Sequence, residues 1–215
     1  MRSLLAWLCC VAPAAGETVY FAGFAAGVST LSADAGSAVS GGAAALSQYK
    51  PENGPALNVF GGAHLSDYIS VQGSYVWNAN DLSLASVDSR GGFYEQRRSS
   101  SQRSLAADLL LYFRNPRSRV RPFLSGGVGV AGFRSSARAL SAARQVPPLP
   151  PDEFMSAKAA LRVAVGMDVA VAGGWAFRYS FCEILRSNPI SALLTPPGSR
   201  NLANFQNLFG FVKSF

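Results

Sequence analysis

The chain has few of the side chains that bind metals or form disulfides. Its 215 residues include one histidine and three cysteines, and two of the cysteines, Cys9 and Cys10, lie close to the start. A structural zinc site takes four ligands, mostly Cys and His, and a disulfide takes two cysteines in an oxidising compartment. The carboxylates lack the spacing of a calcium loop, and no glycine-rich loop precedes a helix. We therefore expect neither a metal nor a cofactor.

Long apolar runs are also scarce. The segment "MRSLLAWLCCVAPAAGE" has one arginine, a short apolar run and small residues before Glu17. This order is typical of a secretory signal peptide. The apolar run is shorter than the ~20 residues that a membrane-spanning helix needs. The sequence therefore predicts a signal peptide at 1–16 and one exported domain at 17–215.

Acidic residues are fewer than basic ones. Charged residues make up 14% of the chain, and the net charge at pH 7 is +7. No nucleic-acid recognition motif accompanies this positive charge. In an exported protein the anionic partners are lipid phosphates and lipopolysaccharide, so we expect these partners and no nucleic acid.

The sequence is rich in alternation between large apolar residues and small or polar ones. In "LRVAVGMDVAVAGGWAFRYSF", residues 161–181, bulky side chains occupy every second position on both sides of Gly173 and Gly174. A period of two predicts β-strands, and the glycines predict a hairpin turn between them. The opposite face carries Gly, Ala and isolated charges, which suits the lining of a narrow interior.

Eight segments of this kind follow one another. They are 20–31, 56–65, 69–78, 105–113, 123–133, 160–171, 175–183 and 204–215. In the fifth, Phe123 and Phe133 fall on the face of small residues. The connections are alternately short and long, which is typical of an up-and-down barrel of the bacterial outer membrane with short periplasmic turns. The sequence thus predicts an all-β, eight-stranded antiparallel transmembrane barrel with both termini in the periplasm.

The long connections are polar and rich in Ser, Gly, Ala or Pro. They are 32–55, 79–104, 134–159 and 184–203. We expect them to be mobile and solvated, as surface loops usually are. The stretch "SSARALSAARQ" in the third is a candidate for a short helix.

The last segment, "NFQNLFGFVKSF", places four phenylalanines on one face: Phe205, Phe209, Phe211 and Phe215. It resembles the terminal strand signal of outer membrane barrels. The strands "PFLSGGVGVAGF" and "RVAVGMDVAV" resemble the small outer membrane β-barrel family that includes the transmembrane domain of outer membrane protein A. The resemblance extends from about Thr18 to Phe215. It implies a location in the bacterial outer membrane and recognition of the final aromatic residue by the barrel assembly machinery, and we expect a monomer.

A lipid-facing arginine near the bilayer midplane costs roughly 2–4 kcal/mol, so the small, charged face is expected to line the lumen. If residues 172–174 form a three-residue turn, Asp168 lies opposite Arg178, and both point inward. The predicted polar network of the lumen comprises Asp108, Arg162, Asp168, Arg178, Asn58, Gln72 and His64. In an eight-stranded barrel side chains just about fill the interior, so we interpret this network as a plug. A gate that rearranges to pass small solutes is the alternative.

The one histidine is the main candidate for catalysis. His64 and Ser66 resemble the His-x-Ser pair of the lipid A deacylase family. However, they lie beside a periplasmic turn, whereas that chemistry faces the outer leaflet, so we predict no catalytic residues. Four arginines in the second long connection are instead candidates for bidentate contacts to lipopolysaccharide phosphates: Arg90, Arg97, Arg98 and Arg103.

These observations predict a non-enzymatic outer membrane protein with a structural or surface-interaction role. Its specificity would reside in the long outer connections, which bind an extracellular ligand that the sequence does not identify. A small gated pore is the alternative, and a lipid A-modifying enzyme ranks third. A soluble ligand-binding barrel would need an apolar interior and a polar exterior, which is the reverse of the observed pattern.

Overall fold

A computed structural model describes residues 19–215 except 41–42, 144–148 and 199. Its strands are, in chain order, β1 (Val19–Leu31), β2 (Asp34–Ser40), β3 (Ala43–Pro51), β4 (Gly54–His64), β5 (Ile69–Ala79), β6 (Leu82–Asp88), β7 (Phe93–Tyr112), β8 (Val120–Ala143), β9 (Glu153–Ala170), β10 (Trp175–Ser187) and β11 (Asn201–Ser214), with one 3-10 turn, η1 (Ser191–Leu193). Within the described ranges, no helix has the length and hydropathy needed to cross a membrane. The signal peptide predicted at 1–16 lies outside the described residues.

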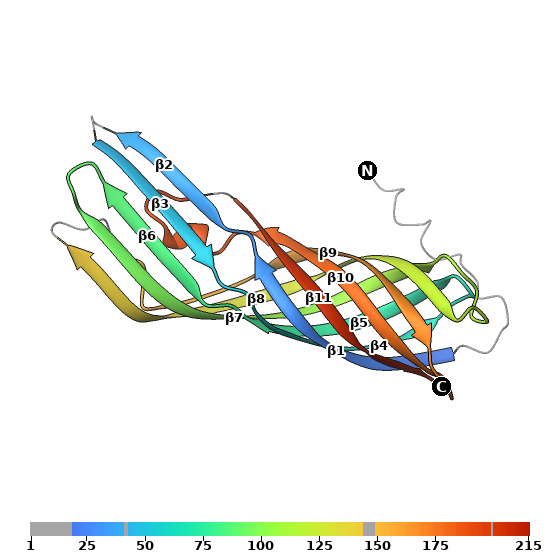
Figure 1. The fold of residues 1–215 in the computed structure, drawn as a ribbon. Coiled ribbons are helices and arrows are strands. Elements are labelled where there is room, and N and C mark those ends of the chain that lie inside the picture. The colour runs from blue at the N-terminus through green and yellow to red at the C-terminus, as the bar shows by residue number, and fades with distance from the viewer. Residues whose placement is uncertain (1–18, 41–42, 144–148, 199) are drawn as a thin grey trace, which may run out of the picture.

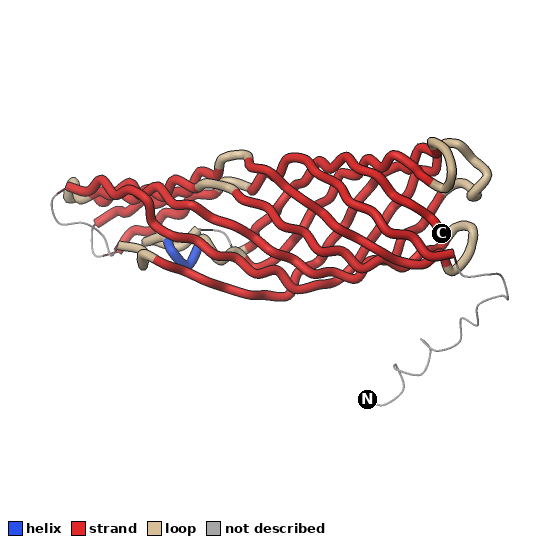
Figure 2. Tube along the Cα trace, turned by 90° about the horizontal axis from the view of Figure 1, so that it is seen from below, coloured by secondary structure: helices blue, strands red, loops and turns tan. Residues whose placement is uncertain are grey.

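Eight of the strands close into a ring around a lumen (Figure 2). The order around the ring is β1-β4-β5-β7-β8-β9-β10-β11, and β11 pairs with β1 to complete it. Every pairing is antiparallel. The eight strands correspond one by one to the eight predicted segments, so the predicted fold class is confirmed.

The hairpin between β9 and β10 has the register that its glycines predict. Gly173 and Gly174 have φ values of +58° and +77°, in the left-handed region that favours glycine. The backbone N–H of Val171 donates to the carbonyl of Trp175 at 2.9 Å. The resulting register places Arg178 opposite Asp168.

The two faces of the ring differ in polarity. Along β5, Val71 and Tyr75 are 40% and 45% exposed, whereas Gln72 and Ser74 are 7% and 1% exposed. The outward apolar residues contact acyl chains when the barrel lies in a bilayer. The hydrophobic band therefore lies on the outside, and the polar residues lie in the lumen.

Three strands extend well beyond the ring at the end away from the C-terminus. β7, β8 and β9 contain 20, 24 and 18 residues, whereas a tilted strand crosses a membrane with about 9–11. The outer part of β7 pairs with β6, β6 pairs with β3, and β3 pairs with β2. Figure 1 shows this continuation, which we call the extracellular sheet: β2, β3, β6 and the outer parts of β7–β9.

The prediction that the long connections are mobile and solvated is therefore wrong for most of their length. The predicted helix at "SSARALSAARQ" is also wrong, because its described residues continue β8 as far as Ala143. Alternation is present in these segments, but in the outer part of β7 the buried positions hold Gln, Arg and Ser in place of aliphatic residues. Pairing with neighbouring strands, rather than local propensity, makes them β-structure.

The inner face of the extracellular sheet holds an apolar core. Its buried members are Leu31, Tyr49, Leu82, Leu84, Tyr94, Phe133, Ile190, Leu193, Leu194 and Leu202. Three of these residues come from the β10–β11 connection around η1. The Ser86 hydroxyl donates to the Thr195 carbonyl at 2.6 Å, and the Ser47 hydroxyl donates to the Pro196 carbonyl. These contacts hold the β10–β11 connection against the inner face of the sheet.

Candidate functional site

Two buried ion pairs lie in the lumen of the ring. In the first, Arg178 Nε donates to Asp168 Oδ1 at 2.6 Å, and Arg178 Nη2 donates to Asp168 Oδ2 at 2.7 Å. The side chains of Arg178 and Asp168 are 4% and 9% exposed. This two-point geometry matches the planar guanidinium to the carboxylate and fixes the orientation of both.

Further partners accept two of the three remaining N–H donors of Arg178. Its Nη1 donates to Gln72 Oε1 at 2.7 Å, and its Nη2 also donates to the Tyr112 hydroxyl at 2.9 Å. The Tyr112 hydroxyl in turn donates to Asp168 Oδ2 at 2.8 Å. Arg178 is therefore bonded to β5, β7 and β9 at once, which spans much of the lumen.

The second ion pair joins Arg162 on β9 to Asp108 on β7, through Arg162 Nη1 and Asp108 Oδ2. The Ser74 hydroxyl donates to Asp108 Oδ2 at 3.0 Å and accepts a hydrogen bond from Arg162 Nη1 at 3.1 Å. Gln72 Nε2 donates to Ser74 Oγ at 2.9 Å. Because Gln72 also accepts from Arg178, it connects the two ion pairs into one hydrogen-bonded chain.

Phe123 and Phe133, which fall on the small face of the fifth predicted segment, both point into the lumen and are 3% exposed. The ring of Phe123 lies 5.0 Å from the guanidinium carbon of Arg178, within cation–π range. Gly166 makes room for it, because a Cβ at that position would lie 2.5 Å from Phe123 Cζ. Phe123 thus departs from the pattern of apolar residues outside, and its inward ring stabilises the buried guanidinium of Arg178.

The structure places two of the seven predicted residues outside this chain of hydrogen bonds. Asn58 is buried in the lumen, but its Oδ1 has no hydrogen-bond partner among the described residues. His64 lies at the periplasmic end, where its Nδ1 is 2.6 Å from Ser70 Oγ. Ser74 and Tyr112 were missed. The alternation places both inward, but nothing in the sequence marks them as partners of the ion pairs.

His64 and Ser66 do not form a nucleophile and base. Ser66 Oγ accepts the backbone N–H groups of Tyr68 at 3.3 Å and Ile69 at 3.1 Å, so it caps the periplasmic turn. The imidazole instead contacts Ser70. Activation of Ser66 would require a hydrogen bond from its hydroxyl to the imidazole of His64, and the ring is hydrogen-bonded to Ser70 instead.

A cavity of about 680 Å³ opens at the periplasmic end of the lumen. His64, Arg121, Asp168 and Arg178 are among its lining residues. Arg121 lies over the Tyr112 ring, with its guanidinium carbon 4.0 Å from the ring centroid. From the periplasm, the lumen is therefore accessible as far as the first ion pair.

Arg186 is a third buried lumen arginine, but it has no counter-charge. Its Nη1 donates to the Ala131 carbonyl at 3.3 Å, and its guanidinium carbon lies 5.4 Å from the centroid of the Phe133 ring. Its Nε and Nη2 have no partner in the described part of the chain, and no carboxylate there forms an ion pair with it. It therefore differs from Arg178, although both lie on the inward face of β10.

Of the four arginines expected to contact lipopolysaccharide, Arg90, Arg97 and Arg103 are exposed. Arg98 is 1% exposed, which corrects that expectation. Its Nη1 donates to Gln96 Oε1 at 2.6 Å and its Nε donates to Ser135 Oγ at 2.9 Å, inside the extracellular sheet. Desolvation by burial lowers the pKa of Arg98. Arg97 and Arg98 are neighbours on one strand, so their side chains face opposite sides of the sheet.

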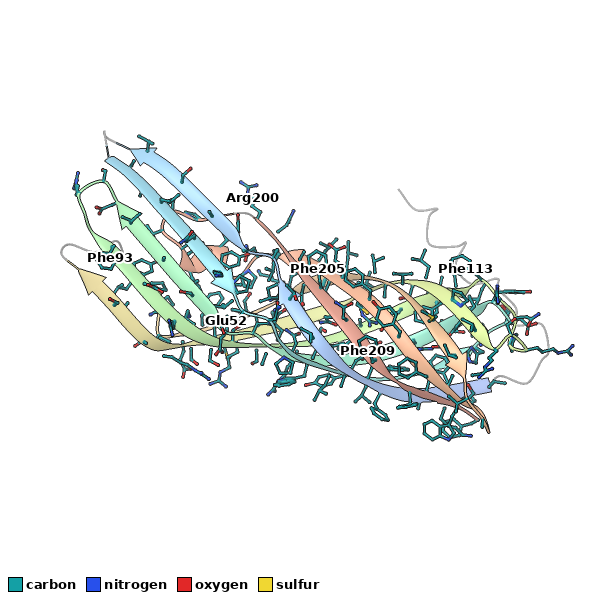
Figure 3. All side chains as sticks on the ribbon, in the orientation of Figure 1. Glu52, Phe93, Phe113, Arg200, Phe205 and Phe209 are labelled. Atoms are coloured by element: carbon teal, nitrogen blue, oxygen red, sulfur yellow. The ribbon has the colours of Figure 1, made fainter. Side chains whose placement is uncertain are left out.

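The four phenylalanines of the last strand lie on the outer face of β11. Phe209, Phe211 and Phe215 are 52%, 42% and 75% exposed, and Phe205 is half-buried beside them. Figure 3 labels Phe205 and Phe209 on this strand. The rings of Tyr179 and Phe209 lie 4.9 Å apart. This seam between β10 and β11 is a continuous aromatic surface toward lipid.

Replacement of Arg178 by methionine is expected to lower the free energy of unfolding by about 3–5 kcal/mol, because it leaves Asp168 as a buried, unpaired carboxylate. Arg186→Met is expected to be neutral or stabilising, because it removes a buried charge that has no partner. The two substitutions are chemically identical and lie on the same face of β10. Urea unfolding of the refolded protein in lipid vesicles, followed by tryptophan fluorescence, measures both, and equal destabilisation would contradict this assignment.

Comparison with known proteins agrees with the fold. The family model described as "Outer membrane protein beta-barrel domain" matches residues 3–189. No curated protein matches the sequence significantly.

Two solved structures share the fold at low sequence identity. The surface protein NspA of Neisseria is 12% identical, with a TM-score of 0.51 over 93% of this chain and 100% of that one. OprG of Pseudomonas aeruginosa is 14% identical, with a TM-score of 0.50 over 92% of this chain and 95% of that one. With the family match across most of its length and a closed ring of antiparallel strands, the chain belongs to the β-barrel family of the bacterial outer membrane.

Proposed function

We propose that this protein is a closed, non-enzymatic barrel that presents the extracellular sheet at the cell surface for contact with an extracellular partner. The observation that carries the proposal is the combination of a filled lumen with an outer region that is itself folded. A protein that serves only as a pore does not need the apolar core that the extracellular sheet holds outside the membrane.

The lumen contacts support the closed state. The ion pairs and Gln72 link β5, β7, β9 and β10 across the interior. Further out, the apolar core and the β10–β11 connection occupy the inner side of the extracellular sheet. A solute would have to displace both layers to cross.

The outward face of the extracellular sheet supports a role in surface interaction. Leu46, Val87 and Phe93 are side by side in the register of β3, β6 and β7. They are 48%, 44% and 40% exposed. Contiguous exposed apolar side chains rimmed by polar residues often mark interaction sites. Phe93 lies in the outer region of the sheet (Figure 3), far from the ring of eight strands, so this row lies beyond the level of the bilayer.

A non-enzymatic role is supported by the arrangement around the one histidine. His64 is hydrogen-bonded to Ser70 at the periplasmic end, and the hydroxyl of Ser66 accepts backbone hydrogen bonds. A lipid A-modifying site in the outer leaflet would need its catalytic groups near the opposite end of the barrel.

A small gated pore is the second candidate function, and the periplasmic cavity favours it. That cavity of about 680 Å³ already extends to Asp168 and Arg178. Rearrangement of the two connected ion pairs and of the β10–β11 connection would then open a path.

Planar bilayer recordings separate these two functions. The closed barrel is expected to give no conductance steps above those of a protein-free bilayer, because the buried side chains leave no continuous water path. The pore is expected to give steps whose ion selectivity changes in Asp168→Asn/Arg178→Gln. A protein whose unboiled and boiled gel bands differ is folded, and steps from such a sample would refute the closed state.

Cell attachment tests the surface role. Cells that display Leu46→Ser/Val87→Ser/Phe93→Ser are expected to attach less to one another and to epithelial monolayers than cells with the unaltered protein, because the apolar row is lost. The matched control is Gln48→Ser/Ala85→Ser, which changes the adjacent row on the same face of β3 and β6. Unchanged attachment of the triple variant in both assays would count against the proposal.

We also propose that the barrel assembly machinery reads the last strand through Phe215. This residue is 75% exposed at the end of the aromatic seam. Phe215→Ala is expected to reduce the amount of heat-modifiable barrel in the outer membrane, without slowing unassisted refolding in detergent. Equal loss in both settings would instead indicate that Phe215 acts on stability alone.

A further inference from the structure

Two exposed arginines mark the outer edge of the apolar band on β7 and β8. Along β7, Leu105 is 65% exposed to lipid, and Arg103 is the next outward residue toward the extracellular side. Along β8, Val130 is 55% exposed, and Arg134 lies two outward positions further on. Trp77 is the register partner of Arg103 on β5, and tryptophan is typical of the membrane interface. Arg103 and Arg134 therefore lie at headgroup level.

A groove of about 440 Å³ separates these two arginines. In the register, Arg103, Gly132 and Ala157 form one row across β7, β8 and β9. Arg134 and Met155 belong to the next row outward. The floor of the groove is low because Gly132 has no side chain. A Cβ at this position would have one neighbouring atom within 4 Å, the Arg103 carbonyl oxygen at 3.7 Å, so the space above the glycine is open.

The charges of this groove are largely uncompensated. The guanidinium of Arg103 has neither a hydrogen bond nor an ion pair to the residues that the structure describes. Arg134 Nη2 lies 3.7 Å from Glu153 Oε2, but the two side chains are 63% and 70% exposed. Exposed ion pairs of this kind contribute little and exchange readily with other partners. Met155, which is 70% exposed, adds an apolar wall beside them.

We propose that this groove binds a phosphate group of lipid A, the phosphorylated glycolipid of the outer leaflet. A guanidinium matches a phosphate with two parallel hydrogen bonds, and two guanidiniums on either side of an open floor suit a doubly charged group. The acyl chains of the same molecule then lie along the apolar band below, beginning at Leu105 and Val130. The groove lies at the end of the barrel opposite the short turns, which is the outer-leaflet side.

This site goes beyond the proposed function, because it concerns the lipid that surrounds the barrel rather than a partner above it. It also differs from the cluster that the sequence suggests. Arg98 is buried, and Arg134 belongs to β8, in a segment that the sequence pattern predicts to be a loop. Only Arg103 is common to both sets.

Native mass spectrometry of the refolded full chain in non-ionic micelles measures the binding. The probes are diphosphorylated lipid A, lipid A without its phosphates, and phosphatidylglycerol. Arg103→Gln/Arg134→Gln is expected to weaken binding of diphosphorylated lipid A by about tenfold or more, because two charge-assisted contacts are lost. Lipid A without phosphates is expected to bind weakly to both proteins.

Arg97→Gln is the matched control, because Arg97 is exposed on the same face of β7 but outside the groove. It is expected to change the affinity by less than about twofold, since the lost charge is not in contact with the lipid. Heat-modifiability verifies folding, and the single variants replace the double variant if that one fails to fold. Equal affinity of the unaltered and double-variant proteins, equal loss in Arg97→Gln, or equal binding of phosphatidylglycerol and lipid A would each overturn the proposal.

Discussion

Closure of the backbone hydrogen-bond ladder is the constraint on which the rest of this structure depends. In hydrocarbon, an unpaired N–H or C=O group costs several kcal/mol, so a sheet can cross a membrane only if its edge strands pair with each other. Here β1 and β11 make that final pairing over eleven registered positions. Once the ring is closed, alternation sends one set of side chains to lipid and the other set to the lumen.

Beyond the periplasmic cavity, the lumen then has to satisfy its own charges without bulk water. It does so with a chain of hydrogen bonds in which Gln72 connects Arg178 to Ser74 and thereby to Asp108. Space is adjusted by pairing large side chains with glycines, as with Phe123 and Gly166. Arg186 is the exception, because its charge is buried without compensation. The compensated arginines therefore link strands through charge-assisted hydrogen bonds, whereas Arg186 has only the neutral Ala131 carbonyl as an acceptor.

Sequence reasoning recovered the ring because its signal is strong and local. Period-two alternation of aliphatic and aromatic residues located all eight strands, and the glycines of the β9–β10 turn were enough to place Asp168 opposite Arg178. The extracellular sheet was missed because Gln, Arg and Ser occupy the buried positions of the outer part of β7, and because β3 and β6 are paired across a sequence distance that no local pattern reveals. The burial of Arg98 is not predicted for the same reason, because the pattern indicates no strand at that position. Ser74 and Tyr112 lie on the predicted faces, but their partners depend on which strands meet across the lumen.

The length of β8 determines how far the extracellular sheet extends above the membrane. At ~3.3 Å per residue and a tilt of about 45°, a strand of 24 residues rises roughly 55 Å along the membrane normal, of which the apolar band occupies about 25 Å. Roughly half of that rise is therefore available to lift the outer sheet above the lipid surface. The part of β8 above the membrane is continuous with the part that crosses the bilayer, and both are hydrogen-bonded to β7. The extracellular sheet is therefore held upright on the ring and does not fold down onto the membrane surface. A partner would meet it at a fixed height and in a fixed orientation.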